Sequence, residues 1–274
     1  LPVAVEHRAD QEDPARRLAM EENPEEWLRW YLSDRFYRPF TVNQQSVIAA
    51  IEERIKFGGS KAIADSRGGG KTAITEGMSL KGILTGRLRY PLVLAANAGD
   101  AGRLVSNIKS PLETSDRLLA DYPEVCVPVR DLEGAPQRGP TQIVDGEHTL
   151  LKWSTGHVRF PRVFVNWCRT CFTESDNGQC PKCGAKSDRW LSPASGAVLE
   201  AVGIFGKIRG RRHGAQRPDF VIADDIEDEE AATSAQKRTK ILRVLENAVP
   251  LLAGPDKRIA IMMLCTIQNP HCVA

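Results

Sequence analysis

The chain of 274 residues carries a formal net charge of +2, with 42% hydrophobic and 26% charged residues, a composition typical of a globular domain. No run approaches the roughly 18 consecutive apolar residues of a membrane span, and the first ten residues lack the apolar core of a secretory signal. We therefore expect neither a membrane partner nor a secretory signal peptide.

Residues 1–38 are predicted to form an N-terminal helical segment. This segment is rich in acidic residues, arginine and tryptophan, and residues 24–37 have helical spacing. A further helix is predicted over 42–57, ending at the pair Gly58 and Gly59. Its apolar face consists of Val42, Val47, Ile48, Ile51 and Ile55.

The rest of the chain alternates between strand and helix patterns. Strands are expected at 61–65, 91–97, 219–224 and 258–266, and helices at 71–86, 98–123 and 231–249. Such alternation predicts an α/β fold with a mostly parallel sheet and helices on both faces. Between 126 and 206 the helical periodicity fades and short β-like runs appear, so we predict a small β-rich insertion there.

A glycine-rich loop follows the first predicted strand and precedes a helix. Its backbone amides can form an anion nest for phosphates, with the Lys71 ammonium on the β- and γ-phosphates and the Thr72 hydroxyl on Mg²⁺. The first glycine of the usual phosphate loop is replaced by Asp65. A glycine-rich turn with a chance Lys-Thr pair is the alternative. The candidate nucleotide-binding residues are Ser66, Arg67, Gly68, Gly69, Gly70, Lys71 and Thr72.

Two further strand ends carry polar side chains. The apolar run 220–223 leads into Asp224, which we assign to Mg²⁺, as in a Walker B motif. Asp225 or Glu227 would then orient or deprotonate the attacking water, although an acidic loop after a buried strand has the same pattern. Thr266 ends another apolar strand and is a candidate for coupling hydrolysis to movement, unless it serves only the turn.

Four cysteines form two C-x-x-C pairs within residues 168–184. Two such knuckles match a tetrahedral Zn²⁺ site with no open position for catalysis, against the alternatives of free thiols or an iron cluster. We expect the metal to staple an insertion that is too short to bury its own core; contact with nucleic acid is the other hypothesis. The predicted zinc ligands are Cys168, Cys171, Cys180 and Cys183.

Taken together, these motifs resemble the ATPase domain of the large terminase subunit, the DNA-packaging motor of tailed bacteriophages. The resemblance is carried by NQQ at 43–45, SRGGGKT at 66–72, RPDFVIADDIEDEE at 217–230 and the Thr of LCTIQN, and it covers most of 40–274, with 126–206 only loosely similar. It implies a P-loop NTPase fold of the ASCE/RecA-like class that hydrolyses ATP with Mg²⁺ and moves double-stranded DNA into a procapsid.

The same resemblance implies roles and partners. Arg67 would act on the γ-phosphate in cis or in trans, or be an ordinary surface arginine. Gln44 or Gln45 would read the adenine edge, or be an ordinary polar side chain on the helix surface. The partners would be double-stranded DNA, the small terminase subunit and further copies in a ring, a pentamer on the portal, in the host cytoplasm.

The predicted domains are the helical segment 1–38 and the ATPase domain 39–274, with the zinc-bearing insertion 126–206. Large terminases usually add a nuclease, but nothing after residue 231 supplies an acidic cluster, so we expect no DNA cleavage from this chain. The alternatives are a helicase-like nucleic-acid ATPase, or a zinc-ribbon nucleic-acid-binding module whose phosphate loop is inactive.

Overall fold

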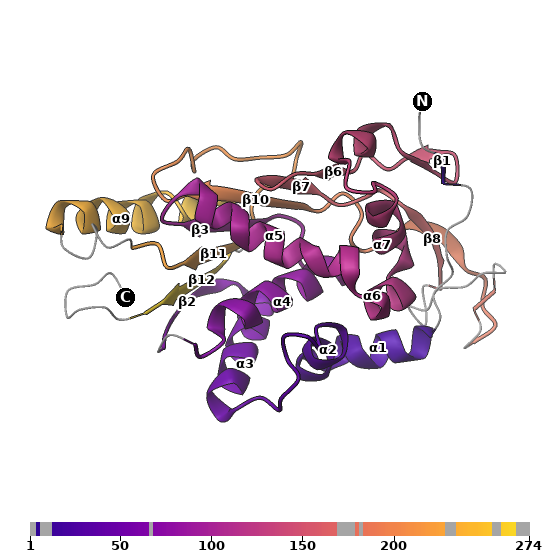
Figure 1. The fold of residues 1–274 in the computed structure, drawn as a ribbon, viewed down its shortest axis with the longest axis horizontal. Helices are drawn as coiled ribbons and strands as arrows, with labels where there is room; N and C mark the ends of the chain where they lie inside the picture. The colour runs from indigo at the N-terminus through magenta and orange to yellow at the C-terminus, as the bar shows by residue number, and fades with distance from the viewer. Residues whose placement is uncertain are drawn as a thin grey trace.

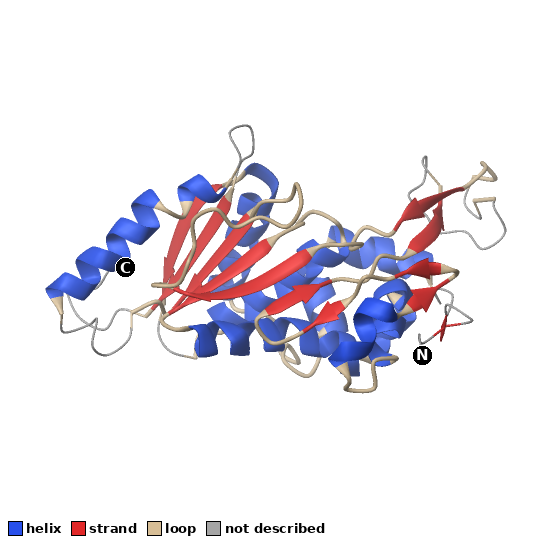
Figure 2. Ribbon diagram, turned by 90° about the horizontal axis from the view of Figure 1, so that it is seen from above, coloured by secondary structure: helices blue, strands red, loops and turns tan. Residues whose placement is uncertain are grey.

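The protein is described here from a computed structural model. It describes residues 4–5, 13–65, 68–168, 179–180, 183–227, 234–253 and 259–266. They form a mixed α/β fold around a seven-stranded sheet, which confirms the predicted fold class at that level (Figures 1 and 2).

The central sheet has the strand order β2-β12-β11-β3-β10-β7-β6. The first five strands are mutually parallel, whereas β7 and β6 extend the sheet as antiparallel neighbours. Its strands are β2 (Gly59–Ala64), β3 (Pro91–Ala95), β6 (Lys152–Trp153), β7 (His157–Arg159), β10 (Val198–Gly203), β11 (Phe220–Asp224) and β12 (Ala260–Cys265). The sheet is therefore mostly parallel, as the alternating sequence pattern predicts.

Two smaller sheets lie outside it. One consists of β1 (Ala4–Val5), β4 (Ile143–Val144) and β5 (Glu147–His148). The other is the antiparallel pair of β8 (Phe164–Trp167) and β9 (Asp188–Leu191). Figure 1 shows β8 and α9 at opposite ends of the molecule.

The helices lie before, between and after the strands of the central sheet along the chain. They are α1 (Pro14–Glu22), α2 (Pro24–Tyr31), α3 (Val42–Phe57), α4 (Lys71–Leu84), α5 (Ala98–Thr114), α6 (Asp116–Asp121), α7 (Pro123–Arg130) and α9 (Ala235–Asn247), with 3₁₀ turns η1 (Pro136–Thr141) and η2 (Pro250–Leu252). Among the described residues, no helix is both long and apolar enough to cross a membrane.

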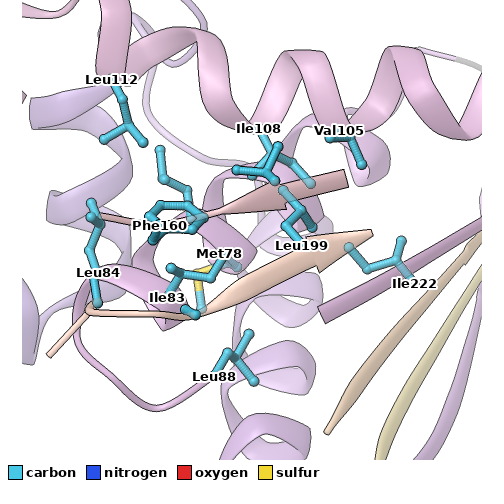
Figure 3. Close-up of a cluster of buried hydrophobic side chains, with 14 of the residues drawn as sticks. Met78, Ile83, Leu84, Leu88, Val105, Ile108, Leu112, Phe160, Leu199 and Ile222 are labelled. Carbon is cyan, nitrogen blue, oxygen red and sulfur yellow. The ribbon is translucent and has the colours of Figure 1, made fainter. Parts of the chain in front are cut away.

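The two faces of the sheet are covered by different helices. On one face Val105, Ile108 and Leu112 of α5 pack over Phe160 and Leu199 (Figure 3). On the other face alternate strand residues, such as Leu92 and Val221, join a second buried cluster with Ile241 of α9. Because neighbouring residues of a strand point to opposite faces, the apolar runs of β3 and β11 supply both clusters.

The N-terminal helices pack onto this core. Asn23 ends α1 and its side chain accepts the Glu25 and Glu26 amides at the start of α2, where Pro24 takes the first helical position. Trp27 is completely buried and donates its indole N–H to the Tyr122 hydroxyl at 3.0 Å. The buried residues of α2 belong to the same cluster as those of α4 and α5.

The stretch 126–206 differs in part from a separate insertion. It begins inside α7, and its last strand, β10, lies between β3 and β7 in the central sheet. Strands of two or three residues, such as β6 and β7, are too short for a clear alternation. They pair with each other as neighbours in the chain, but β7 joins the sheet through β10, about 40 residues later. The β8–β9 pair lies outside the central sheet, and Cys168, Cys180 and Cys183 lie in the chain between these two strands.

Candidate functional site

Three neighbouring parallel strands end at one edge of the sheet. Ala64 pairs with Cys265 at the ends of β2 and β12, and Asp224 pairs with Leu264 at the end of β11. The loops that follow these strands therefore open on the same crevice, the usual place for ligands in parallel α/β sheets.

The loop between β2 and α4 has the backbone shape that glycine allows. Gly68 has φ 84° and Gly70 has φ 85°, and Gly70 is the N-cap residue that immediately precedes α4. A Cβ on Gly70 would lie 3.0 Å from the Gln44 amide nitrogen. The free N–H groups of a helix start attract anions. Ser66 and Arg67 lie outside the described residues.

Lys71 links two of the strand ends. Its ammonium donates to the Asp65 carbonyl at 3.2 Å and to the Thr266 hydroxyl at 3.1 Å, and the residue is 6% exposed. The predicted phosphate lysine and the predicted coupling threonine are thus in direct contact, although 195 residues separate them.

Thr72 and Asp224 also meet. The Thr72 hydroxyl lies 3.0 Å from Asp224 Oδ1 and 3.2 Å from Oδ2. Burial raises the pKa of Asp224 to about 6; the Thr72 hydrogen bond and Lys71 oppose this rise, and Asp225 adds to it. A hydroxyl and a buried carboxylate this close form the ligand pair that a hard cation such as Mg²⁺ prefers.

Near Thr72 and Asp224 the structure places a further carboxylate, Glu76, which was not among the residues predicted from the sequence. Glu76 lies one turn after Thr72 on α4 and accepts from Arg35 Nη1 at 3.1 Å and from Asn107 Nδ2 at 2.9 Å. Burial raises its pKa to about 7, and Asp224 is close enough to contribute to that rise. The signal in the sequence was an acid four residues after Thr72, on the same helical face.

The two candidate glutamines have different surroundings. Gln44 closes the capping box of α3, its Oε1 accepting the Thr41 amide at 3.0 Å, while its Nε2 donates to the Gly69 carbonyl at 3.2 Å. Gln45 instead donates to Glu25 at 3.1 Å. Gln44 therefore touches the glycine loop, whereas Gln45 contacts the N-terminal helices. A cavity of about 410 Å³ between α3 and β2 lies beside Asp65.

The residues after Asp224 leave the sheet sharply. Asp225 has φ 37°, is exposed, and donates its amide to the Leu264 carbonyl at 3.1 Å. Ile226 is buried and Glu227 is partly buried. Both candidate bases thus follow Asp224, the candidate Mg²⁺ ligand, within three residues, and the geometry favours neither of them.

Three of the four candidate zinc ligands lie together. The sulfur atoms of Cys168, Cys180 and Cys183 are all within 4.8 Å of one another, and those of Cys168 and Cys183 are 3.7 Å apart. Sulfurs on a tetrahedron around zinc are about 3.8 Å apart, given Zn–S bonds of about 2.3 Å. The second pair sits on a tight turn, with Gly184 at φ 69°. Cys171 lies outside the described residues.

Comparisons with known proteins add little information about the function of this chain. No protein-family model and no curated protein matches the sequence. Solved structures that match include one titled "The Phi-28 gp11 DNA packaging Motor", with 9% identity, a TM-score of 0.37 and 78% of this chain covered. This chain spans 48% of that one. The proposals below rest on the site geometry and the sequence motifs.

Proposed function

We propose that this chain is an ATP-hydrolysing motor domain with a P-loop NTPase fold of the ASCE/RecA-like class. The observation that supports this proposal best is the contact of four side chains from three strand ends: Lys71 with Thr266, and Thr72 with Asp224. A chance Lys-Thr pair in a glycine turn would have no reason to meet a strand-end carboxylate.

Each residue has a task in this proposal. The amides of the glycine loop and the Lys71 ammonium bind the β- and γ-phosphates, whose oxygens replace the Asp65 and Thr266 contacts of that ammonium. The Thr72 hydroxyl and the Asp224 carboxylate hold Mg²⁺, which neutralises charge on the phosphates when bound. Burial of Lys71 and Asp224 strengthens both interactions by excluding water.

Three further residues complete the proposed chemistry. Asp225 or Glu227 orients or deprotonates the water, and Arg67 stabilises negative charge on the γ-phosphate. Thr266 couples phosphate loss to β12, because the Lys71 ammonium that binds phosphate also contacts its hydroxyl. Gln44, whose side chain donates to the Gly69 carbonyl, or Gln45 reads the adenine edge of the nucleotide.

Zinc is proposed for the cysteine cluster. The three described thiols fit a tetrahedral site, and Cys171 would be the fourth ligand. Four thiolates leave no open position, so the metal would hold the chain after β8 and before β9 together rather than act on a substrate.

The particular motor we propose is the large terminase subunit of a tailed bacteriophage. Its substrate would be double-stranded DNA moved into a procapsid in the host cytoplasm. Its partners would be the small terminase subunit and further copies of this chain, in a pentameric ring on the portal. This finer proposal rests on the resemblance of the motifs at 43–45, 66–72 and 217–230.

The test is Mg²⁺-dependent ATP hydrolysis by the wild type, Lys71→Ala and Asp225→Asn. Lys71→Ala is expected to lower turnover on the order of 100-fold, because the charge that stabilises the phosphates is lost. The matched control is Lys56→Ala at the exposed end of α3, which should keep the wild-type rate.

Equal rates in Lys71→Ala and the wild type would refute the proposal. Turnover that DNA stimulates and that separates strands would favour the helicase-like ATPase. Nucleotide binding without turnover would favour the zinc-ribbon module with an inactive loop.

A further inference from the structure

A basic cavity lies at the opposite end of the central sheet from the candidate nucleotide site. It has a volume of about 550 Å³. Its charged and titratable lining residues are Lys152 on β6, His157 and Arg159 on β7, and His213 in the loop before β11. Strand β6 ends the sheet order that β2 begins, and four strands lie between β7, which lines this cavity, and β2, which precedes the glycine loop.

The strand register places two cations side by side. Trp153 and Val158 are paired and point into the core under α5, so their neighbours Lys152 and Arg159 point to the other face. Lys152 and Arg159 are themselves directly paired across the two strands. Like charges in directly opposed positions repel each other. Among the described residues, no carboxylate forms an ion pair with either side chain.

A carboxylate near the cavity, Glu200, is already engaged. Glu200 on β10 pairs with Arg211 at 2.7 Å, accepts the Tyr90 hydroxyl and contacts His157 Nδ1 at 3.2 Å. Three cations (Lys152, Arg159 and Arg211) against one carboxylate leave a formal charge of +2 in and beside the cavity, with both histidines neutral.

The pKa of His213, which lines this cavity, reflects the same excess of positive charge. The rings of His157 and His213 are 5.9 Å apart. Partial burial lowers the pKa of His213, and Arg159, His157 and Lys152 lower it further, while Glu200 opposes them. A bound anion would relieve this repulsion.

The basic character continues along the same face of the sheet. The loop 206–217 runs from the cavity to a second hollow of about 390 Å³, lined by Lys207, Arg209 and Arg243. Arg209 donates to the Asn247 carbonyl at the end of α9, so this hollow lies beside the helix that covers this face. Two basic hollows joined by an arginine-rich loop fit a ligand with repeated negative charges better than a single small anion.

We propose that Lys152 and Arg159 form a binding site for the phosphate backbone of duplex DNA, and that the loop 206–217 continues this site toward α9. The phosphate chemistry follows from the unpaired cations. The choice of DNA rests on the motor function proposed above. Backbone contacts of this kind position nucleic acid without reading its sequence.

The test is the affinity of the full chain for a labelled duplex, measured by fluorescence anisotropy over a series of salt concentrations without nucleotide. Lys152→Ala and Arg159→Ala are each expected to weaken binding several-fold and to reduce the salt slope by about 1, because each removes one phosphate contact. Lys56→Ala, on the helix layer of the opposite face, should change neither quantity. Thermal unfolding of each variant checks that it is folded.

Unchanged affinity and slope in both variants would overturn the site. A second result would also overturn it: inorganic phosphate shifts the His213 ring signals, but the variants keep the DNA affinity of the wild type. The cavity would then bind a small anion only. ATP hydrolysis by the same variants separates this inference from the motor proposal. DNA binding through Lys152 and Arg159 in a chain without turnover refutes the motor alone, and normal turnover with unaltered DNA binding in the variants refutes the site alone.

Discussion

At the residue scale, the buried carboxylate of Asp224 illustrates how burying a charged group destabilises a folded protein. The group is 8% exposed and Lys71 is near it, but burial outweighs that attraction and raises its pKa to about 6. Glu76, one turn from Thr72, has a pKa raised to about 7 for the same leading reason. A bound Mg²⁺ would remove this cost by neutralising the charge.

This leads to a prediction on Asp224→Asn. A carboxyl whose folded pKa is raised contributes stability below its ordinary pKa near 4, and loses it as the pH rises through about 6. Without Mg²⁺ and nucleotide, Asp224→Asn should therefore be more stable than the wild type at pH 8, on the order of 2 kcal/mol, and the difference should shrink at pH 5. Urea unfolding at both pH values measures this. A variant less stable than the wild type at pH 8 would contradict it.

At the element scale, the strand–loop–helix order and the edge strand β2 could be predicted from sequence, whereas the antiparallel edge formed by β7 and β6 could not. The apolar runs 220–223 and 91–95 are long enough to identify buried strands. The paired strands β6 and β7 have two and three residues, and they join the sheet only through the pairing of β7 with β10, which is distant in sequence.

The site shows the same division. Lys71, Thr72 and Asp224 could be selected as candidates from the sequence because a glycine loop and a strand-end acid are local patterns. Glu76 was not selected, because its partners Arg35 and Asn107 come from two other elements of the fold. Only the folded chain brings these three together.

The close packing of α4 on α2 gives a second prediction. A Cβ on Gly77 would lie 2.4 Å from Leu28 Cδ2 and 2.9 Å from Leu32 Cδ1. Gly77→Ala should therefore lower stability on the order of 1–3 kcal/mol, although alanine is the better helix former. Gly156→Ala is the matched control, because no heavy atom lies within 4 Å of its added Cβ. Chemical denaturation compares them; equal stability of Gly77→Ala and the wild type would show that α2 does not pack this tightly.

At the scale of the whole molecule, the cysteine cluster belongs to a part with its own packing. Val163 and Val165 beside it are buried, yet they belong to neither of the two large core clusters. The pair of β8 and β9 stands at the end of the molecule away from α9 (Figure 1). We therefore expect its stability to depend on the proposed zinc more than that of the central sheet does.

Cys180→Ser tests this expectation. The variant should lose bound zinc and show faster hydrogen exchange over Asp188–Leu191, while exchange in β3 and β11 stays slow. Metal analysis and exchange by mass spectrometry measure both effects. Zinc content equal to that of the wild type would rule out the cluster as its site, and uniform loss of protection would show that the metal supports the whole fold.

The central claim is that Thr72 and Asp224 act on one cation in one site, and a double-mutant cycle on Mg²⁺-dependent ATP hydrolysis tests it most directly. If both side chains hold the same Mg²⁺, Thr72→Val combined with Asp224→Asn should be scarcely slower than the worse single variant, because removing either ligand already disrupts the shared site. Losses that add fully in the double variant would contradict the account, because the two residues would then act independently.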